Sequence, residues 1–444
     1  MIDKYKLYYR TFLVLFWTGM CYGFFADDVP ALKTLQSYVM VLEDTALLLL
    51  GLMLLKNRLD KWIIYTFLII GFISTIILNH VGIVMFFNGS RGFFGILFAI
   101  PIIRFFLTGE RAPEFKKKFD HQLKIWLVIQ AICITIQFLR FGANDHGGGS
   151  MGFGFSGVVS ILIYLTSFYL TIQNWDFNNI GKSFKENKWN FILLYPTLLN
   201  ETKISFILAV VYAILLCRPS KALMVKLVYI IPIGIAALIG MAHLYIKATG
   251  QDFDTVFSSE YIYDYLVGDD LDYYVDIALM VQDGDFDVDE SNPEDFWAVD
   301  IQRVGKLMLM WDPLKKTPGG IWFGAGLGQF RGNTNLNPTK FATQNKWLLR
   351  GSLPWPFTVI IQLGIIGMIW FLWAYFSVFF YKVKGNPQLN RILIFLAIIL
   401  ILDQVYNDAF AFYTFCMMIT YIALALNLQP LNKKDDPSAL LQEN

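Results

Sequence analysis

The stretch "WIIYTFLIIGFISTIIL", residues 62–78, decides the fold class. It contains no charged residue, and as an α-helix it would be about 25 Å long, close to the roughly 30 Å of hydrocarbon in a bilayer. Similar runs are "FFGILFAIPIIRFFL" (93–107) and "IWLVIQAICITIQFL" (125–139). Because 56% of the 444 residues are hydrophobic and only 16% are charged, the chain lacks the polar surface of a soluble protein. The sequence predicts an all-α polytopic membrane protein.

About twelve transmembrane helices are predicted from such runs. Their approximate bounds are 11–26, 38–55, 61–78, 92–108, 122–140, 153–173, 189–200, 204–217, 222–246, 354–380, 391–406 and 409–428. The seventh and eighth spans are short and are interrupted at "PTLLNETK" (196–203). Such a break at membrane depth requires protein or water to satisfy the freed backbone groups.

The connections between these spans alternate in charge. Every second connection is basic, for example "KNRLDK" (56–61) and "RAPEFKKKFDHQLK" (111–124). The opposite short connections contain few cations, chiefly Lys33, Arg91, Arg140 and Lys203. Because basic connections face the cytoplasm, both termini are predicted to be cytoplasmic.

One connection is much longer than the others and is too polar to span. Its first half has 16 Asp and Glu between residues 251 and 300 and no Lys or Arg, whereas its second half is basic. A loop of this length usually folds and functions. We therefore divide the chain into an N-terminal bundle of about nine spans, a large periplasmic loop domain, a C-terminal group of about three spans and a cytoplasmic tail, with bounds 1–246, 247–353, 354–430 and 431–444.

Composition excludes several function classes. The net charge of +1 gives no basic field for nucleic acid. The four cysteines lack the CxxC spacing of metal or redox sites, and no metal or cofactor is expected. The acidic run at 283–294 has the spacing of an EF-hand loop, but Val288 stands where that loop needs glycine, and Pro293 interrupts it. We interpret this run as an acidic surface.

A glycine stretch, "GGIWFGAGLGQF" (319–330), lies in the basic half of the long loop. Its spacing fits neither a dinucleotide-binding fingerprint nor a P-loop. Two interpretations stay open: a tight turn that passes close to a neighbouring helix, or a backbone that approaches a bulky ligand beside the membrane.

The surrounding sequence resembles the O-antigen polymerase and ligase superfamily. The resemblance is carried by an Arg that begins an amphipathic helix ending in Trp, a Pro, a Gly-x-Gly-x-Gly-x-Phe turn and a Gly-Ile-Ile-Gly span. In this chain these positions are Arg303, Trp311, Pro318, Gly324, Gly326, Gly328, Phe330, Gln362, Gly364 and Gly367. Upstream, "LLNETKISFILAVVYAILL" is similar to a family span with a basic motif, where Lys203 occupies the basic position. The matched region covers about residues 190–380.

The resemblance implies a function. The substrate would be an oligosaccharide on polyprenyl pyrophosphate, transferred to an acceptor sugar hydroxyl during surface polysaccharide biosynthesis, with a chain-length regulator among the partners. Many relatives, ligases especially, have a His-Asn pair after the glycine turn, but this sequence has no histidine after His243. That departure favours a polymerase over a ligase. A lipid-linked oligosaccharide flippase is the other alternative, although the two halves of the chain are unlike.

Cations are needed to stabilise the leaving pyrophosphate. The candidates for catalysis are Arg303, Lys203 and Glu201. Asp300 is a second candidate base and also a candidate partner of Arg303. Asp403 and Asp408 lie in an apolar stretch, but "DQVYND" also fits a short turn. The candidates for binding pyrophosphate or glycan are Arg91, Arg331, Arg350, Gly324, Gly326, Gly328 and His146.

Overall fold

The computed structural model describes residues 3–142, 147–152, 154–200, 203–217, 301–330, 338–349, 351, 353–379, 387–406 and 408–425, together with 275–276 and 279–280. Within these ranges every regular element is a helix, and no strand occurs. The predicted all-α class is therefore confirmed for the described part of the chain.

The first half of the described chain, up to Leu216, contains the helices α1 to α11 and the short elements η1, η2 and η3. Local sequence explains where the first two begin: the Asp3 side chain accepts a hydrogen bond from the Tyr5 nitrogen at 3.1 Å, and Pro30 stands at the start of α2. The elements are α1 (Lys4–Asp28), α2 (Pro30–Leu54), α3 (Arg58–Phe72), η1 (Ile73–Leu78), α4 (Ile83–Ser90), η2 (Arg91–Phe93), α5 (Phe94–Thr108), α6 (Ala112–Phe141), η3 (Gly149–Met151), α7 (Ser156–Ile172), α8 (Ile180–Glu186), α9 (Lys188–Ile192), α10 (Pro196–Leu199) and α11 (Lys203–Leu216).

The second half combines short helices with long apolar ones. The short helices belong to the predicted loop domain, and the long ones follow it. They are α17 (Arg303–Leu309), α18 (Trp311–Lys315), α19 (Gly320–Phe323), α20 (Lys340–Gln344), α21 (Lys346–Leu349), α22 (Trp355–Phe379), α23 (Pro387–Tyr406), η4 (Ala409–Ala411) and α24 (Tyr413–Ala425).

Six helical segments among the described residues are long and apolar enough to cross a membrane. They are Ala31–Leu54, Arg58–Leu78, Ile83–Thr108, Ala112–Phe141, Trp355–Val378 and Gln388–Val405. Three shorter apolar helices, Ser156–Ile172, Ile204–Leu216 and Tyr413–Ala425, accompany them. These helices are those of a membrane protein. The predicted span 222–246 lies outside the described residues.

Two predicted boundaries differ from the structure. The predicted connection 79–91 is largely helical, because α4, η2 and α5 continue one another as Ile83–Thr108. The predicted span 189–200 consists of α9 and α10, which have 5 and 4 residues. Pro196 at the start of α10 cannot donate to a preceding turn, so this segment is a broken helix rather than one continuous span.

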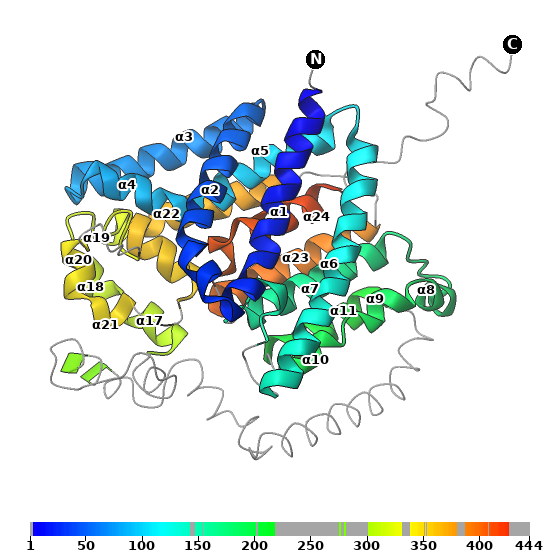
Figure 1. The fold of residues 1–444 in the computed structure, drawn as a ribbon. Helices are drawn as coiled ribbons and strands as arrows, with labels where there is room; N and C mark the ends of the chain where they lie inside the picture. The colour runs from blue at the N-terminus through cyan, green and yellow to red at the C-terminus, as the bar shows by residue number, and fades with distance from the viewer. Residues whose placement is uncertain are drawn as a thin grey trace, which may run out of the picture.

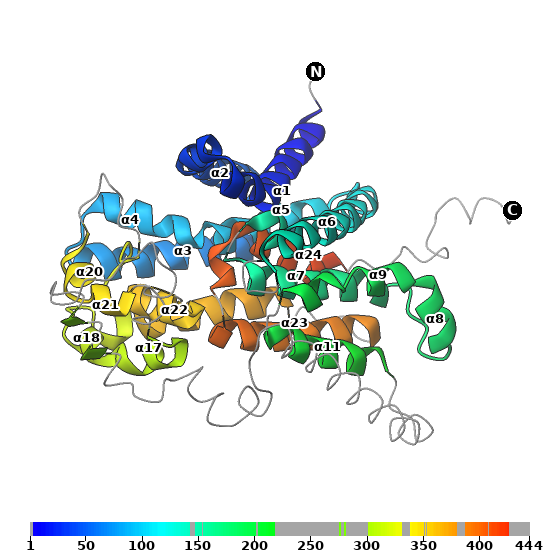
Figure 2. The ribbon, with the colours of Figure 1, turned by 60° about the horizontal axis from the view of Figure 1, so that its bottom comes forward.

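The core lies where α5, α7 and α24 meet at the centre of the molecule (Figures 1 and 2). All residues of α7, most of those of α5 and nearly all of those of α24 are buried. Aromatic rings join α24 to α6: the Phe119 and Tyr421 ring centroids are 4.6 Å apart, and Phe115 stacks on Phe106 of α5 at the same distance. Ring pairs of this kind add specific packing to simple burial.

The short helices between the long apolar ones lie in two separate places. Helices α17–α21 gather beside α4 and one end of α22, whereas α8 and α9 lie on the opposite side of the molecule (Figures 1 and 2). Between connections predicted as cytoplasmic, Arg111 pairs with Asp3 at 3.1 Å, and Arg391 donates to the Cys217 carbonyl at 2.8 Å. Contacts from the predicted periplasmic connections form the site described next.

Candidate functional site

The glycine turn between α19 and Gln329 is buried and adopts a conformation that requires glycine. Gly324, Gly326 and Gly328 have φ values of 70°, 90° and 95°, in the left-handed region that residues with a Cβ rarely adopt. All three are buried. The turn therefore lies inside the protein, in contact with neighbouring helices.

The turn fills a break in the membrane helix α22. Gly364, inside α22, has φ 68° and ψ −166°, which interrupts the helix. The freed carbonyls of Ile361 and Gln362 accept hydrogen bonds from the Ala325 and Gly326 nitrogens at 2.7 and 3.1 Å. A broken span is stable in a membrane only when such groups are satisfied. The glycine turn supplies those donors.

The turn also binds the π-helical end of the preceding span, η1. The Ser74 hydroxyl group lies 2.5 Å from the Phe323 carbonyl oxygen and 3.0 Å from the Gln362 carbonyl oxygen, as a donor shared between them. The Leu327 nitrogen donates to the Thr75 hydroxyl oxygen at 2.9 Å, and the Asn79 amide donates to the Gly324 carbonyl at 2.9 Å. π-turns are rare and are frequent at functional sites.

The hydrogen bonds of the turn decide between the two interpretations of the glycine stretch. The nitrogens of Ala325, Gly326, Leu327 and Gly328 all donate to protein acceptors, the last to the Gln362 side chain at 2.9 Å. These groups are already used inside the protein. The geometry favours the tight turn beside a helix, and the glycines shape a wall instead of presenting N–H groups to a ligand.

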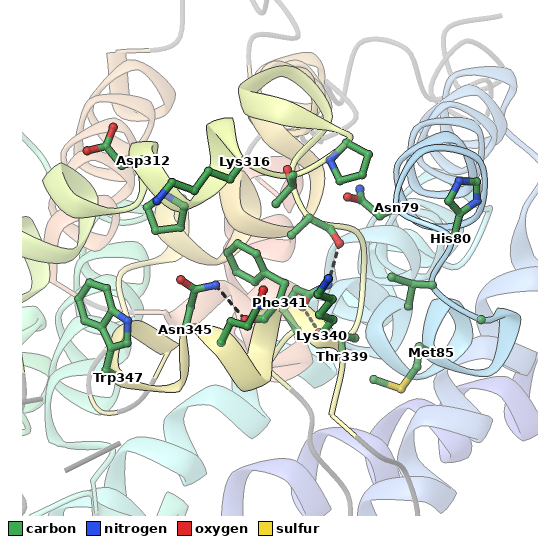
Figure 3. A pocket seen from close by; sticks show the side chains of 18 of the residues that line it. Asn79, His80, Met85, Asp312, Lys316, Thr339, Lys340, Phe341, Asn345 and Trp347 are labelled. Atoms are coloured by element: carbon green, nitrogen blue, oxygen red, sulfur yellow. Dashed lines mark hydrogen bonds between the residues drawn. The ribbon is translucent and has the colours of Figure 1, made fainter. Parts of the chain in front are cut away.

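We define the turn cavity as the space of about 1120 Å³ that opens beside this turn. Its walls come from the η1–α4 connection, α18 and the start of the glycine turn, and α20–α21. The lining residues are Asn79, His80, Val81, Gly82, Met85, Leu309, Asp312, Pro313, Lys316, Thr317, Pro318, Ala325, Gln329, Thr339, Lys340, Phe341, Gln344, Asn345 and Trp347. Figure 3 shows Asn79, His80 and Met85 on one side of it and Asn345 and Trp347 on the other.

The lining of the turn cavity combines cations, amides and aromatic rings. Lys316 and Lys340 are exposed and bring two positive charges, against the single negative charge of Asp312 in the same lining. Amide side chains, including Asn79 and Asn345, offer both donors and acceptors, and Trp347 offers an indole face. Cations suit phosphate oxygens, while amides and aromatic faces suit sugar hydroxyls and sugar rings. The cavity can thus hold an anionic glycoconjugate.

His80 is positioned at the rim by an unusual backbone. It is the one non-glycine residue with positive φ in the described ranges, at 52°. It is exposed and lines the cavity. Non-glycine residues in this region often occur at functional sites. The pair Asn79–His80 thus brings a histidine and an asparagine to this cavity from the first half of the chain.

Arg303, the first catalytic candidate, lies outside the lining of the turn cavity. It begins α17, and only the far end of that helix, at Leu309, reaches the cavity. The structure instead brings Arg303 close to Asp408, in the connection between α23 and α24. Burial raises the pKa of Asp408 to about 6, and the positive charge of Arg303 opposes that rise. Asp300, the predicted partner, lies outside the described residues.

Asp403 and Asp408 occupy different environments. The sequence "DQVYND" also fits a short turn, but Asp403 lies within α23, fully buried, and its two oxygens have no hydrogen-bond partner among the described residues. Asp408 lies in the connection itself. A buried carboxylate in a membrane helix is costly and commonly functional.

Arg91 is paired inside the protein. Its Nε lies 2.6 Å from an Asp44 carboxylate oxygen of α2, and the exposed fractions of the two side chains are 23% and 18%. Arg91 does not line the turn cavity. This geometry supports a role in joining α2 to the start of α5.

The remaining candidates are only partly described. Lys203 is the first residue of α11, and its side chain lies outside the described residues. Several other candidates lie entirely outside the described residues, namely Glu201, His146, Arg331, Arg350 and the acidic run 283–294. No group of three or more His, Cys, Asp or Glu that could hold a metal ion occurs in the described part of the chain.

Sequence reasoning missed Asn79 and His80, and it counted Lys316 and Lys340 only as part of a basic half-loop. A signal existed for the first pair, since "NH" follows an apolar span directly at its predicted periplasmic end.

Neither a protein-family model nor a curated protein sequence matches this chain.

Proposed function

We propose that this chain is a polymerase of lipid-linked oligosaccharide repeat units in surface polysaccharide biosynthesis. The observation that carries the proposal is the turn cavity, in which Lys316, Lys340, amides and Trp347 meet beside a broken membrane helix. A substrate with a lipid tail, a pyrophosphate and a glycan needs all these elements at one place. A headgroup carried by a membrane lipid would reach the turn cavity from the membrane surface.

The proposed reaction transfers a glycan without a nucleotide. The acceptor sugar hydroxyl attacks the anomeric carbon of the donor, a new glycosidic C–O bond forms, and the bond from that carbon to the pyrophosphate oxygen breaks. Polyprenyl pyrophosphate leaves with the electron pair, where Lys316 and Lys340 stabilise its charge. His80 accepts the proton of the acceptor hydroxyl as a general base. No metal or cofactor is part of this proposal.

The proposed topology has about twelve spans in a bacterial inner membrane, with cytoplasmic termini and a periplasmic loop domain. Two observations support it. The basic connections alternate along the sequence, and connections assigned to the same side contact one another, as Asn79 contacts Gly324 and Arg111 contacts Asp3. In this topology the turn cavity faces the periplasm, where lipid-linked repeats are polymerised in the family that the sequence resembles.

The position of the cavity favours an enzyme over a flippase. A transporter holds its substrate near the middle of the membrane between related halves. The turn cavity instead lies at one end of the helices, formed mainly by the loop domain and the η1–α4 connection. A ligase would use the same donor, so acceptor identity separates it from a polymerase.

Deletion of the gene tests the proposal, with the surface polysaccharide viewed on a gel. Loss of a polymerase leaves single repeat units on their anchor, whereas loss of a flippase or ligase removes surface display. In the second arm, purified protein receives lipid-linked repeats without nucleotide. Longer lipid-linked chains support the proposal, and unchanged repeats from a folded protein refute it.

A further inference from the structure

A second cavity lies at the other end of the bundle, and the proposed function does not use it. We define it as the arginine cavity, a space of about 510 Å³ between the end of α2, the start of α3 and the last turns of α5. It is lined by Lys56, Asp60 and Arg104 on its polar side and by Leu54, Phe105 and Leu107 on its apolar side. The connection "KNRLDK" at its mouth is one of those predicted to be cytoplasmic.

Arg104 and Asp60 form a buried and incomplete ion pair. Arg104 Nε lies 3.2 Å from Asp60 Oδ2, and the exposed fractions of the two side chains are 14% and 2%. The contact lacks hydrogen-bond geometry. Arg104 Nε and Nη2 and Asp60 Oδ1 have no hydrogen-bond partner among the described residues. These nitrogens are also closed to solvent, so an acceptor in the adjoining cavity would reach them only after the Arg104 side chain turned toward it. The cost of a buried guanidinium with unused donors favours that turn.

Charge selects the kind of acceptor. The lining holds two cations, Lys56 and Arg104, and a single carboxylate, Asp60. The Lys56 ammonium lies 5.0 Å from the ring centre of Phe105, which keeps it beside the cavity. An arginine with free N–H groups matches the oxygens of a phosphate group. The ligand is therefore anionic and carries phosphate.

The apolar side of the arginine cavity identifies the source of that phosphate. Leu54, Phe105 and Leu107 belong to helices of membrane-spanning length. Leu54 and Leu107 are already buried, but Phe105 is only half-buried. A free phosphate ion would leave its ring in contact with water, whereas a lipid would cover it with its chains. We infer that the arginine cavity binds the phosphate of an anionic phospholipid headgroup, with Arg104 as its principal contact.

Thermal unfolding of the purified full-length chain in detergent tests this inference. Short-chain phosphatidylglycerol should raise the unfolding midpoint by several degrees, because a ligand that binds only the folded state stabilises it. Diacylglycerol with the same chains lacks the phosphate and should leave the midpoint unchanged. Inorganic phosphate at the same concentration should also leave the midpoint unchanged. A full shift with inorganic phosphate would overturn the lipid assignment.

Three substitutions locate the effect. Arg104→Gln should abolish the lipid-induced shift, and Asp60→Asn should keep or enlarge it, because it removes a competing carboxylate. Arg58→Gln is the matched control, since Arg58 is an exposed cation beside the cavity that does not line it, and it should keep the shift. If Arg104→Gln folds poorly, the double variant Asp60→Asn/Arg104→Gln leaves no buried charge. A full shift in either Arg104 variant would overturn the inference.

Discussion

Gly364 of α22 and Trp322 of α19 touch through their backbones. A methyl group on Gly364 would overlap the Trp322 carbonyl group and lie 2.5 Å from the Phe323 nitrogen. This contact seats the glycine turn in the break of α22 and thereby fixes one wall of the turn cavity.

The first prediction concerns that contact. Gly364→Ala should destabilise the protein by more than the roughly 1–3 kcal/mol of backbone strain that a positive φ costs a residue with a Cβ, because backbone atoms also block the methyl group. Gly320→Ala is the control: its φ is also positive, at 56°, but nothing lies within 4 Å of an added Cβ. Thermal unfolding in detergent compares the two. Equal midpoints would show that the contact is unimportant.

The second prediction concerns the cations of the turn cavity. The double variant Lys316→Ala/Lys340→Ala should reduce repeat-unit polymerisation about a hundredfold, as expected when groups that stabilise developing charge are removed. Folding should be unaffected because both side chains are exposed. Lys315→Ala is the matched control, because Lys315 is a neighbouring exposed lysine that does not line the cavity, although its partner Asp312 does. Equal rates in both variants would exclude these lysines from the reaction.

The third prediction concerns His80. If it accepts the acceptor proton, His80→Asn should lower kcat about a hundredfold while KM changes little, within the usual contribution of a general base. His121→Asn is the control, since His121 is an exposed histidine of α6 that lines neither cavity. A rise in KM with unchanged kcat would instead assign His80 to binding.

The fourth prediction concerns pH and Asp408. Burial raises the pKa of Asp408 from 3.8 to about 6, so the folded protein retains a proton that the unfolded chain has lost. The free energy of unfolding should therefore fall as pH rises from about 4 to about 6. Asp408→Asn should flatten this part of the stability profile. If the free energy of unfolding instead rose between these pH values in the wild type but not in Asp408→Asn, the assignment would be contradicted.

The fifth prediction separates two roles of Arg303. Arg303→Ala should abolish elongation, whether the residue binds pyrophosphate or only holds Asp408. The double variant Arg303→Ala/Asp408→Asn also removes the carboxylate whose charged form Arg303 stabilises. Recovered elongation in the double variant would assign Arg303 a positioning role, whereas continued inactivity with normal folding would show that Arg303 acts on more than Asp408. Lys203→Ala, measured in the same assay, tests the other predicted cation.

Six of the predicted spans coincide with described helices that are long and apolar enough to cross a membrane, because their signal is local. Residues 62–78 contain enough apolar length to identify a span, and the structure has them as the helix Arg58–Leu78. At 189–200 hydropathy alone does not show where the helix breaks, but the predicted interruption at 196–203 begins at Pro196, where the structure separates α9 from α10. Helical continuity depends on backbone hydrogen bonds that a hydropathy average does not include.

The turn cavity could not be predicted, because its walls are distant in sequence. Asn79 and Gly324 are 245 positions apart, yet they are hydrogen bonded. The glycine spacing indicated an unusual backbone but could not show that Ile361, Gln362 and Thr75 would use its N–H groups. Only tertiary contacts distinguish a turn that builds a wall from one that binds a ligand.

The hydrogen bond from Ser74 to Gln362 joins positions 288 residues apart. During synthesis, Ser74 and Thr75 enter the membrane long before their partners at Phe323, Leu327 and Gln362 exist. A nascent chain that stops before α19 would retain these polar groups without any of these acceptors and donors. Assembly of this region must then wait until most of the polypeptide has been inserted, and prematurely terminated chains should be recognised as incomplete by the membrane's proteases.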